Sequence, residues 1–537
     1  MPDKGPTADL PKKGPAPSTD EVDLSSVNLP APLVLPYLII LRVLNAFTIH
    51  TFFQPDEYLQ ALEPAHWAVF GYGNLTWEWT NGLRSFVHPL LYALPYKLSE
   101  WTGFGVVGVL YFPKVLNGLL AAFGDYYTYK FVQRAARGSA LEQLARWALL
   151  VSITSGWNWY MVTRSFSSSL EMILTTIALA HWPWGRHVYF ADTAKALSAA
   201  AVSCLIRPTN GLLWLFFGAA LLVRVRSSVT RAKLAVLAIT IGSFFFALGM
   251  AADYAFYGKP TVPLLNFVRF NVFSNLSVFY GLAPWHFYLF QGLPVILLAH
   301  LPLTLMGFSR LWRSQFAFLT VLIILVYSMM THKEFRFIYP LQPLFVYFTA
   351  HGFHRIQRSW LKPVIIATIL LNTAISLFFT QIHERGVMDV MEYLREDIDV
   401  GSIGFLTPCH STPMQSHLHL DIPIMALSCD PPLHLIGNPA ASTLVKTYQD
   451  ESDIFYADPV AFLTQKFPPP IKAKRESGKF EYEWPTHLVF FENLEPIMKP
   501  YLEGSGYQEC ERFFNTWFHW DNRRSGDVIV YCKWPWE

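Results

Sequence analysis

The sequence predicts a polytopic α-helical membrane protein that ends in a small mixed α/β domain. The chain has 537 residues, of which 52% are hydrophobic and only 15% charged, against about 25% charged in an ordinary globular protein. Long apolar segments recur up to residue 381, and the pattern changes after it. We therefore expect most of the chain to be solvated by lipid. The formal net charge of +2 gives no indication of a nucleic-acid partner.

Residues 1–32 are rich in Pro, Ser, Asp and Lys. They lack the apolar run directly after Met1 that a cleavable signal peptide has. The interpretation is a disordered cytosolic tail.

Eleven apolar segments are predicted as spans or half-length spans. They are 33–50, 105–133, 147–161, 166–184, 195–207, 208–223, 234–257, 285–307, 316–331, 337–352 and 361–381. The segments at 195–223 could also form one long helix. Arg207 would then lie in mid-membrane, where a charge is costly unless it faces a cavity. Two half-length helices that meet at Arg207-Pro208 avoid that cost.

Basic residues indicate the orientation, because Lys and Arg accumulate in cytosolic loops. With eleven spans and a cytosolic N-terminus, the basic loops all fall on the cytosolic side. A single helix over 195–223 would move the cluster at 224–233 to the lumen, so the charges favour the hairpin. The luminal segments are then 51–104, the Arg207 turn, 258–284, 332–336 and everything after about 381.

Two luminal sequons make Asn74 and Asn275 candidate N-glycosylation sites. Residues 82–99 are expected to form a helix lying in the membrane interface.

The segment after residue 382 alternates three short β-like runs, at 404–406, 487–491 and 527–531, with turns rich in Pro and Asp. It is predicted as a luminal domain, 382–537, following the membrane domain, 33–381. Four cysteines lie in it, which allow three disulfide pairings in an oxidising lumen. They are Cys409, Cys429, Cys510 and Cys532. The alternative is four buried free thiols.

The first candidate site directly follows the first span and reads Gln54-Pro55-Asp56-Glu57. Two adjacent carboxylates at a membrane edge can hold a general base. The alternative is a helix start, since Pro and acidic residues favour the first turn of a helix.

A second luminal cluster contains His332, Lys333, Glu334 and Arg336. Its cationic groups suit an anionic leaving group such as a phosphate. The alternative is a group of side chains that extends into the lipid headgroups. Arg207 could likewise reach a phosphate, pair with Asp56, or act only as a membrane anchor.

A third luminal cluster contains Trp285 and His286, followed by Gln291-Gly292-Leu293-Pro294. Aromatic rings beside one histidine suit stacking on a sugar. A lone histidine at this position is alternatively an interfacial anchor.

Taken together, the segments 54–57, 207–209, 284–294 and 332–337 resemble the dolichyl-phosphate-mannose-dependent α-mannosyltransferases of glycosyltransferase family 22. The resemblance runs from about residue 33 to 380. It implies the GT-C architecture with about 11 transmembrane helices, in the endoplasmic reticulum membrane, with a luminal catalytic face. Many relatives have His where this chain has Gln54.

The tail segments 405–413, 416–419 and 450–456 resemble one branch of this family. Its members transfer the third mannose, α1,2-linked, to the second mannose of a glycosylphosphatidylinositol (GPI) anchor precursor lipid. The alternative within the family is an α1,2-mannosyltransferase that builds the dolichol-linked N-glycan precursor, which shares the spanning motifs but not this tail.

The resemblance implies a β-linked mannose donor and an α-linked product, which one inverting displacement explains. Asp56 is assigned as the general base, with Glu57 supporting it or positioning the acceptor. The donor phosphate is expected to bind His332, Lys333, Arg336 and Arg207. The substrate-binding residues are expected to be Gln54, Trp285, His286, Glu334, His410 and Ser411.

No metal or other cofactor is expected. The nearest metal-ligand pair is His417 with His419, which is interpreted as structural. A transporter is disfavoured because no internal repeat is visible. A non-catalytic subunit is disfavoured by the pair Asp56-Glu57 with its basic counterparts.

Overall fold

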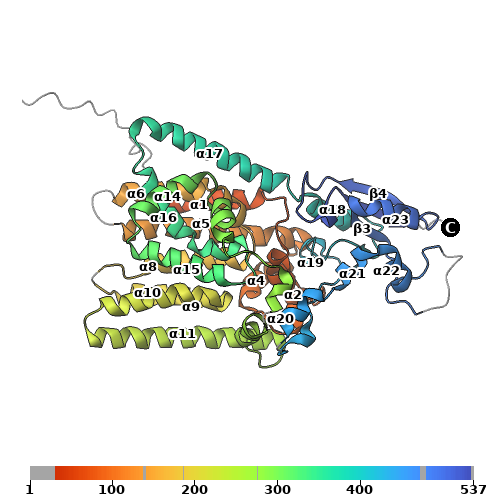
Figure 1. The fold of residues 1–537 in the computed structure, drawn as a ribbon, viewed down its shortest axis with the longest axis horizontal. Helices are drawn as coiled ribbons and strands as arrows, with labels where there is room; N and C mark the ends of the chain where they lie inside the picture. The colour runs from red at the N-terminus through yellow and green to blue at the C-terminus, as the bar shows by residue number, and fades with distance from the viewer. Residues whose placement is uncertain are drawn as a thin grey trace, which may run out of the picture.

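A computed structural model of the chain describes residues 31–136, 141–185, 187–274, 276–438, 440–471 and 479–533. Most of the predicted N-terminal tail, and the sequon residue Asn275, lie outside the described residues. A bundle of helices is joined at one end to a smaller body that contains a β-sheet and the C-terminal end of the chain (Figure 1).

The bundle helices coincide with the predicted apolar segments. They are α1 Ala31–Phe47, α5 Gly105–Ala135, α6 Leu141–Thr154, α7 Gly156–Met161, α8 Ser167–His181, α9 Phe190–Ile206, α10 Gly211–Arg224, α11 Ser228–Tyr257, α13 Leu293–Leu297, α14 Leu301–Arg310, α15 Gln315–Met329, α16 Gln342–Phe353 and α17 Arg358–Gln381. By length and composition, four helical stretches in the described residues can cross a membrane: Gly105–Ala135, Ser228–Tyr257, Tyr288–Arg310 and Arg358–Glu396. The total of eleven spans stays a prediction.

The chain reverses direction at Arg207. Helix α9 ends at Ile206, because the proline that follows Arg207 disfavours helical backbone at that residue. At the far end of α10, Arg224 donates a hydrogen bond of 3.0 Å to the carbonyl of Trp184, close to the start of α9. Helices α9 and α10 therefore form the predicted hairpin.

Shorter helices lie between the bundle and the sheet. They are α2 Glu63–Phe70, α3 Trp77–Thr80, α4 Val87–Thr102 and α12 Pro263–Val268. Helix α4 covers most of the predicted interfacial helix at 82–99. It packs against α5 and α2.

The sheet has five strands in the order β2-β1-β3-β5-β4. The strands are β1 Ile403–Phe405, β2 Ile424–Ala426, β3 His487–Phe491, β4 Tyr507–Phe513 and β5 Val528–Lys533. Strand β1 pairs in parallel with β2 and β3, whereas β5 is antiparallel to both β3 and β4. The three predicted β-like runs lie at β1, β3 and β5, so the mixed character of the domain is confirmed.

Helices accompany this sheet. They are α18 Gly386–Glu396, α19 Gln415–Leu418, α20 Ala441–Leu444, α21 Glu451–Ala457, α22 Pro459–Lys466 and α23 Glu495–Tyr501. Cys409 is bonded to Cys429, and Cys510 to Cys532, which is one of the three pairings that the sequence allows.

One hydrophobic core joins the loop after α1 to the C-terminal domain. Phe52 and Tyr58 from the loop share it with Val387 of α18 and Phe405 of β1. The loop is therefore held against the domain by apolar burial, which fixes the position of the residues between Phe52 and Tyr58.

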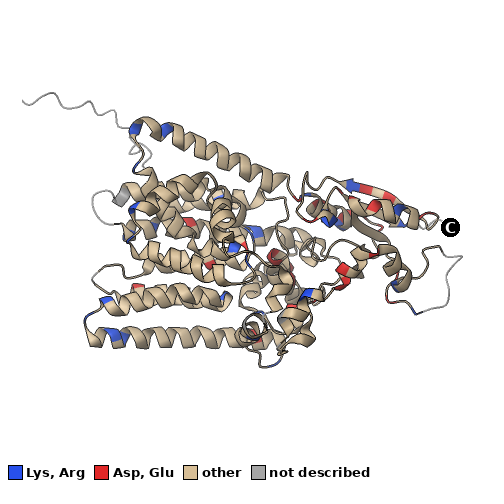
Figure 2. Cartoon of the chain, viewed as in Figure 1, with Lys and Arg blue, Asp and Glu red and all other residues tan. Residues whose placement is uncertain are grey.

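Several Lys and Arg residues lie at the end of the bundle that is remote from the sheet (Figure 2). A basic end opposite the C-terminal domain is the pattern that the predicted orientation requires.

Candidate active site

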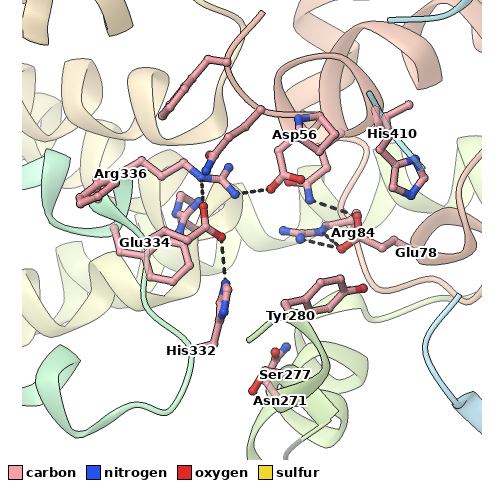
Figure 3. A pocket seen from close by; sticks show the side chains of 18 of the residues that line it. Asp56, Glu78, Arg84, Asn271, Ser277, Tyr280, His332, Glu334, Arg336 and His410 are labelled. Carbon is pink, nitrogen blue, oxygen red and sulfur yellow. Dashed lines mark hydrogen bonds and ion pairs between the residues drawn. The ribbon is translucent and has the colours of Figure 1, made fainter. Parts of the chain in front are cut away.

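A cavity of about 1290 Å³ lies where the bundle meets the C-terminal domain. Both bodies contribute to its wall, including the loop after α1, the turn at Arg207 and the segment around Cys409. Seven of the predicted site residues line it: Gln54, Asp56, Arg207, His332, Glu334, Arg336 and His410. Residues separated by more than 350 positions in the sequence thus meet in one space (Figure 3).

A chain of charged contacts crosses one wall of the cavity. Arg336 donates from one terminal nitrogen to Asp56 at 2.5 Å and from Nε to Glu334 at 2.5 Å. The other oxygen of Glu334 lies 3.0 Å from Nε2 of His332. Figure 3 shows these side chains aligned along the wall. Asp56 is the outermost carboxylate, with 25% of its side chain exposed.

The backbone around Asp56 is fixed on both sides. The amide of Phe52 donates to the carbonyl of Glu384 at 3.0 Å, and the rings of Phe52 and Tyr58 stack 5.5 Å apart. Pro55 precedes Asp56, and Asp56 and Glu57 begin a helical turn that continues through Tyr58–Leu62, so the motif is also the helix start that the alternative interpretation predicted. The carboxylate of Asp56 therefore projects from a rigid segment, as a positioned catalytic group requires.

Glu57 lies differently from Asp56. It is 6% exposed, does not line the cavity and forms an ion pair of 2.8 Å with Arg164. Burial raises the pKa of Glu57, although Arg164 opposes that shift. The two adjacent carboxylates thus occupy separate environments, and only Asp56 faces the cavity.

Arg207 does not pair with Asp56, which was one of the alternatives from the sequence. Its Nε lies 3.0 Å from Glu171 of α8, and its guanidinium lies over the ring of Phe337. Helix α8 supplies this carboxylate from the interior of the bundle, whereas Asp56 is already bound by Arg336.

The electrostatics of the wall favour the charged forms of Glu334 and Arg336. Burial raises the pKa of Glu334, but Arg336 and His332 outweigh it and hold the pKa well below the usual range. Burial lowers the pKa of Arg336, but Asp56 and Glu334 outweigh it and raise the pKa. One terminal nitrogen of Arg336, Nη1, is buried without a hydrogen-bond partner in the described structure. It is a donor directed to no protein group, as an anion-binding site requires.

Besides Glu57, four other predicted catalytic or binding residues do not line the cavity. Lys333 donates to the carbonyls of Ala283 and Met330. Ser411 is 3% exposed and donates to the carbonyl of Pro408. The other two are Trp285, which is 69% exposed, and His286, whose ring lies against that of Trp285.

The cavity wall also carries a second ion pair, between Arg84 and Glu78, which was not predicted. Arg84 binds Glu78 through two nitrogens, at 2.7 and 3.0 Å, and Gln60 donates to the same carboxylate at 3.1 Å. These residues lie in the loop 51–104, where an ordinary polar sequence gives little signal. Arg164 and Glu171 were also missed, although a charge beside or within an apolar segment is itself a functional signal.

Two groupings of possible metal ligands occur in the described residues, and each includes a disulfide-bonded cysteine. One grouping contains Cys409, His410 and Cys429. Because a disulfide sulfur is not a thiolate, neither grouping offers the ligand set of a zinc site. His417 and His419 do not converge on one point, since His419 lies 2.9 Å from His66, whereas His417 packs against Tyr58.

Comparisons with known proteins identify the family of the chain. The model of the Alg9-like mannosyltransferase family matches residues 33–419. GPI mannosyltransferase 3 of Debaryomyces hansenii is 46% identical over 94% of this chain and 93% of its own. The Saccharomyces cerevisiae protein of the same name is 39% identical over 92% and 95%. GPI alpha-1,2-mannosyltransferase 3 of Mus musculus is 36% identical over 92% and 87%.

Among solved structures, the chain is similar to ArnT from Cupriavidus metallidurans bound to undecaprenyl phosphate. The TM-score is 0.55 at 10% identity, over 94% of this chain and 98% of ArnT. This likeness shows a shared GT-C fold. The chain belongs to the Alg9-like mannosyltransferase family and, within it, to the GPI mannosyltransferase 3 group.

Proposed function

We propose that this enzyme transfers the third mannose, in α1,2 linkage, from dolichyl-phosphate-mannose to the second mannose of a GPI-anchor precursor lipid. The observation that carries the proposal is Asp56, a carboxylate on a rigid segment at the cavity wall, bound by Arg336 beside Glu334 and His332. A base next to a cationic group is the arrangement that an inverting displacement from a phosphate requires.

Asp56 acts as the general base. Its Oδ2 accepts from Arg336, and Oδ1 has no hydrogen-bond partner among the described residues. The acceptor 2-hydroxyl approaches Oδ1, gives up its proton to the carboxylate and attacks C1 of the donor mannose. The bond from C1 to the phosphate oxygen breaks, and its electron pair leaves with dolichyl phosphate. Attack from the face opposite the phosphate converts the β-linkage of the donor into an α-linkage.

Arg336 stabilises the leaving group. Its Nη1 is buried without a partner, so a phosphate oxygen there satisfies a donor that the protein leaves unmet. His332, 21% exposed at its side chain, and Arg207 line the same cavity and offer further hydrogen-bond donors to the phosphate. Lys333 supports this segment through its two carbonyl contacts.

Glu57 positions the base and does not exchange protons with substrate. Its buried ion pair with Arg164 anchors the residue next to Asp56, and Arg164 also donates to the carbonyl and the hydroxyl of Thr51. The guanidinium of Arg164 thus binds both ends of the segment from Thr51 to Glu57. This keeps the side chain of Asp56 directed towards the cavity.

The proposed location is the endoplasmic reticulum membrane, with residues 33–381 as the membrane domain and 382–537 as the luminal domain. The basic end of the bundle in Figure 2 supports a cytosolic placement of that end and a luminal cavity. Two disulfides in the C-terminal domain agree with an oxidising compartment.

The test uses microsomes from cells that lack the corresponding enzyme, with and without this chain restored. Labelled dolichyl-phosphate-mannose is added, and GPI lipids and dolichol-linked oligosaccharides are read out together. We expect a two-mannose GPI lipid to become a three-mannose one. Labelling of the oligosaccharide lipids alone would reject the acceptor, and labelling of neither would reject the transferase function proposed here.

A further inference from the structure

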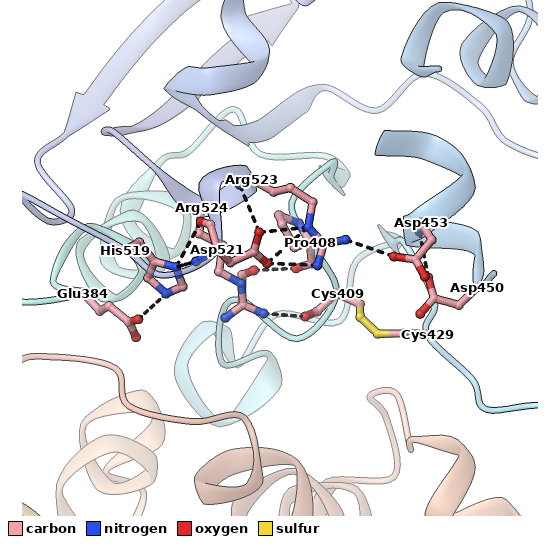
Figure 4. A network of polar contacts seen from close by, with 11 residues as sticks. Glu384, Pro408, Cys409, Cys429, Asp450, Asp453, His519, Asp521, Arg523 and Arg524 are labelled. Carbon is pink, nitrogen blue, oxygen red and sulfur yellow. Dashed lines mark hydrogen bonds and ion pairs between the residues drawn. A yellow bond between two sulfur atoms is a disulfide. The ribbon is translucent and has the colours of Figure 1, made fainter. Parts of the chain in front are cut away.

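The cavity has a second polar region on its C-terminal-domain side, away from Asp56. It is formed around the turn Asn522–Arg524 and the disulfide Cys409–Cys429 (Figure 4). Arg523 and Arg524 both line the cavity. The mechanism above uses neither of them.

Five arginines line the cavity, and four of them have carboxylate partners. The pairs are Arg84 with Glu78, Arg207 with Glu171, Arg336 with Asp56 and Glu334, and Arg523 with Asp521 and Asp453. Arg524 forms no ion pair within the described part of the chain. It donates from one terminal nitrogen to the carbonyl of Cys409 at 3.2 Å, and its Nε is buried without any partner there.

The carboxylates near Arg524 are bound elsewhere. Glu384 accepts from His519 at 2.8 Å, and Asp521 accepts three hydrogen bonds from the guanidinium of Arg523 and one from its backbone amide. Figure 4 shows these side chains on the same side of the disulfide as Arg524. Burial lowers the pKa of Arg524, and the raising effects of Glu384 and Asp521 do not offset it. A guanidinium in this state lacks a counter-charge, and an ionic ligand would supply it.

His410 connects this region to the reaction centre. It lines the cavity and appears beside Asp56 in Figure 3. Burial is the main reason that the pKa of His410 is lowered to about 4. The charge of Asp56 opposes this shift and the charge of Arg524 adds to it, so His410 lies within electrostatic reach of both residues. A substrate that extends from Arg524 past His410 therefore arrives at Asp56.

We propose that Arg524 binds a phosphodiester of the acceptor lipid, through the unpartnered Nε and a terminal nitrogen of its guanidinium. The inference rests on the proposed function, because the donor phosphate is assigned to Arg336 and the acceptor is the other anionic substrate. The planar fork of an arginine matches two phosphate oxygens. The phosphodiester is either the one that links the acceptor glycan to its lipid or one carried on a mannose.

The experiment uses the full chain in lipid nanodiscs, with dolichyl-phosphate-mannose and four synthetic acceptors. The acceptors share the dimannosyl glucosaminyl-inositol glycan. They differ at two positions. The link to the lipid is either the phosphodiester or a neutral ether, and one mannose either carries a phosphodiester or does not.

Arg524→Gln is expected to lower kcat/KM about 10- to 100-fold on each acceptor that carries the contacted phosphodiester. The loss lies in the acceptor KM, whereas the donor KM and the rate on the fully neutral acceptor stay within about twofold. The acceptors on which kcat/KM falls identify the phosphodiester that Arg524 binds. Arg524→Lys keeps the charge and is expected to recover part of the loss.

Arg512→Gln is the matched control, because Arg512 lies on β4, is paired with Glu495 and Glu509, and does not line the cavity. Its kinetics should equal those of the wild type, and melting temperatures of all variants verify folding. Equal losses on charged and neutral acceptors, a rise in the donor KM, or no loss at all would overturn the inference while the proposed function stands. A wild-type chain that transfers to none of the acceptors would instead contradict the proposed function.

Discussion

The buried ion pair between Glu57 and Arg164 allows a quantitative test of which carboxylate does the chemistry. Arg164 is 2% exposed and Glu57 is 6% exposed, with 2.8 Å between their charged atoms. Arg164 also donates to Thr51 and to the carbonyl of Tyr160. Arg164→Met leaves the Glu57 carboxylate buried without its partner, which typically costs about 3–5 kcal/mol of unfolding free energy.

Glu57→Gln is milder. The side chain keeps its shape, and Arg164 retains its contacts with Thr51 and Tyr160, so the expected cost is about 1.5–3 kcal/mol. The double variant, which combines Glu57→Gln with Arg164→Met, leaves no buried charge without its partner. Its loss should be smaller than the sum of the two single losses by about 1–3 kcal/mol, the coupling expected for groups in direct contact.

The assay is equilibrium unfolding in mixed micelles, followed by mannose transfer measured at equal amounts of folded protein. We expect Glu57→Gln to keep its rate within about tenfold of the wild type, because loss of a general base would cost about 10²–10⁴-fold. Arg42→Met is the control, since it breaks another buried ion pair, the 2.6 Å contact with Asp125, away from the cavity. It should lose stability without a specific loss of rate.

The reasoning is refuted by either of two results. One is a stability of Arg164→Met equal to that of the wild type. The other is a folded Glu57→Gln variant that has lost more than about 100-fold in rate, since Glu57 would then be the base.

Three further predictions follow from the same structure. Arg336→Lys removes the fork that holds two carboxylates and the free donor, so kcat should fall about 10²–10³-fold; a change below tenfold in single-turnover kinetics would contradict this role. Replacing Cys409 and Cys429 by serine opens a loop with a separation of 20 residues and should lower the unfolding free energy by about 3 kcal/mol in urea titrations, whereas an unchanged midpoint would show that the bond is not stabilising. Burial lowers the pKa of His66 and His88 to about 3, so both are neutral in the folded protein, whereas in the unfolded chain they titrate near 6.5. Each histidine should therefore lower the unfolding free energy by about 2 kcal/mol between pH 7 and pH 5, and His88→Gln should make that decrease smaller. An unfolding free energy equal at the two pH values would contradict this prediction.

The helices could be predicted from the sequence because lipid solvation imposes a long apolar run on every span. The break at Arg207 was equally predictable, since a charge and a proline in one apolar segment are costly together. The strands at β1, β3 and β5 were visible as short apolar runs between turns.

The partners within the site could not be predicted in the same way. Asp56 and Arg336 are 280 residues apart, and Glu57 and Arg164 are 107 apart. Which charge meets which depends on how the helices pack, and local patterns carry no record of it. For the same reason, the sequence could not show that Trp285, which was expected to bind substrate, lies outside the cavity.

The role of Asp56 as the base is tested most directly by the rate of Asp56→Asn. The purified variant would receive dolichyl-phosphate-mannose and a dimannosyl GPI lipid, and the formation of the trimannosyl product would be timed. The asparagine keeps the shape of the side chain, so donor binding should stay unchanged while the rate falls about 10²–10⁴-fold or more. Turnover close to that of the wild type would contradict the assignment of Asp56 as the base.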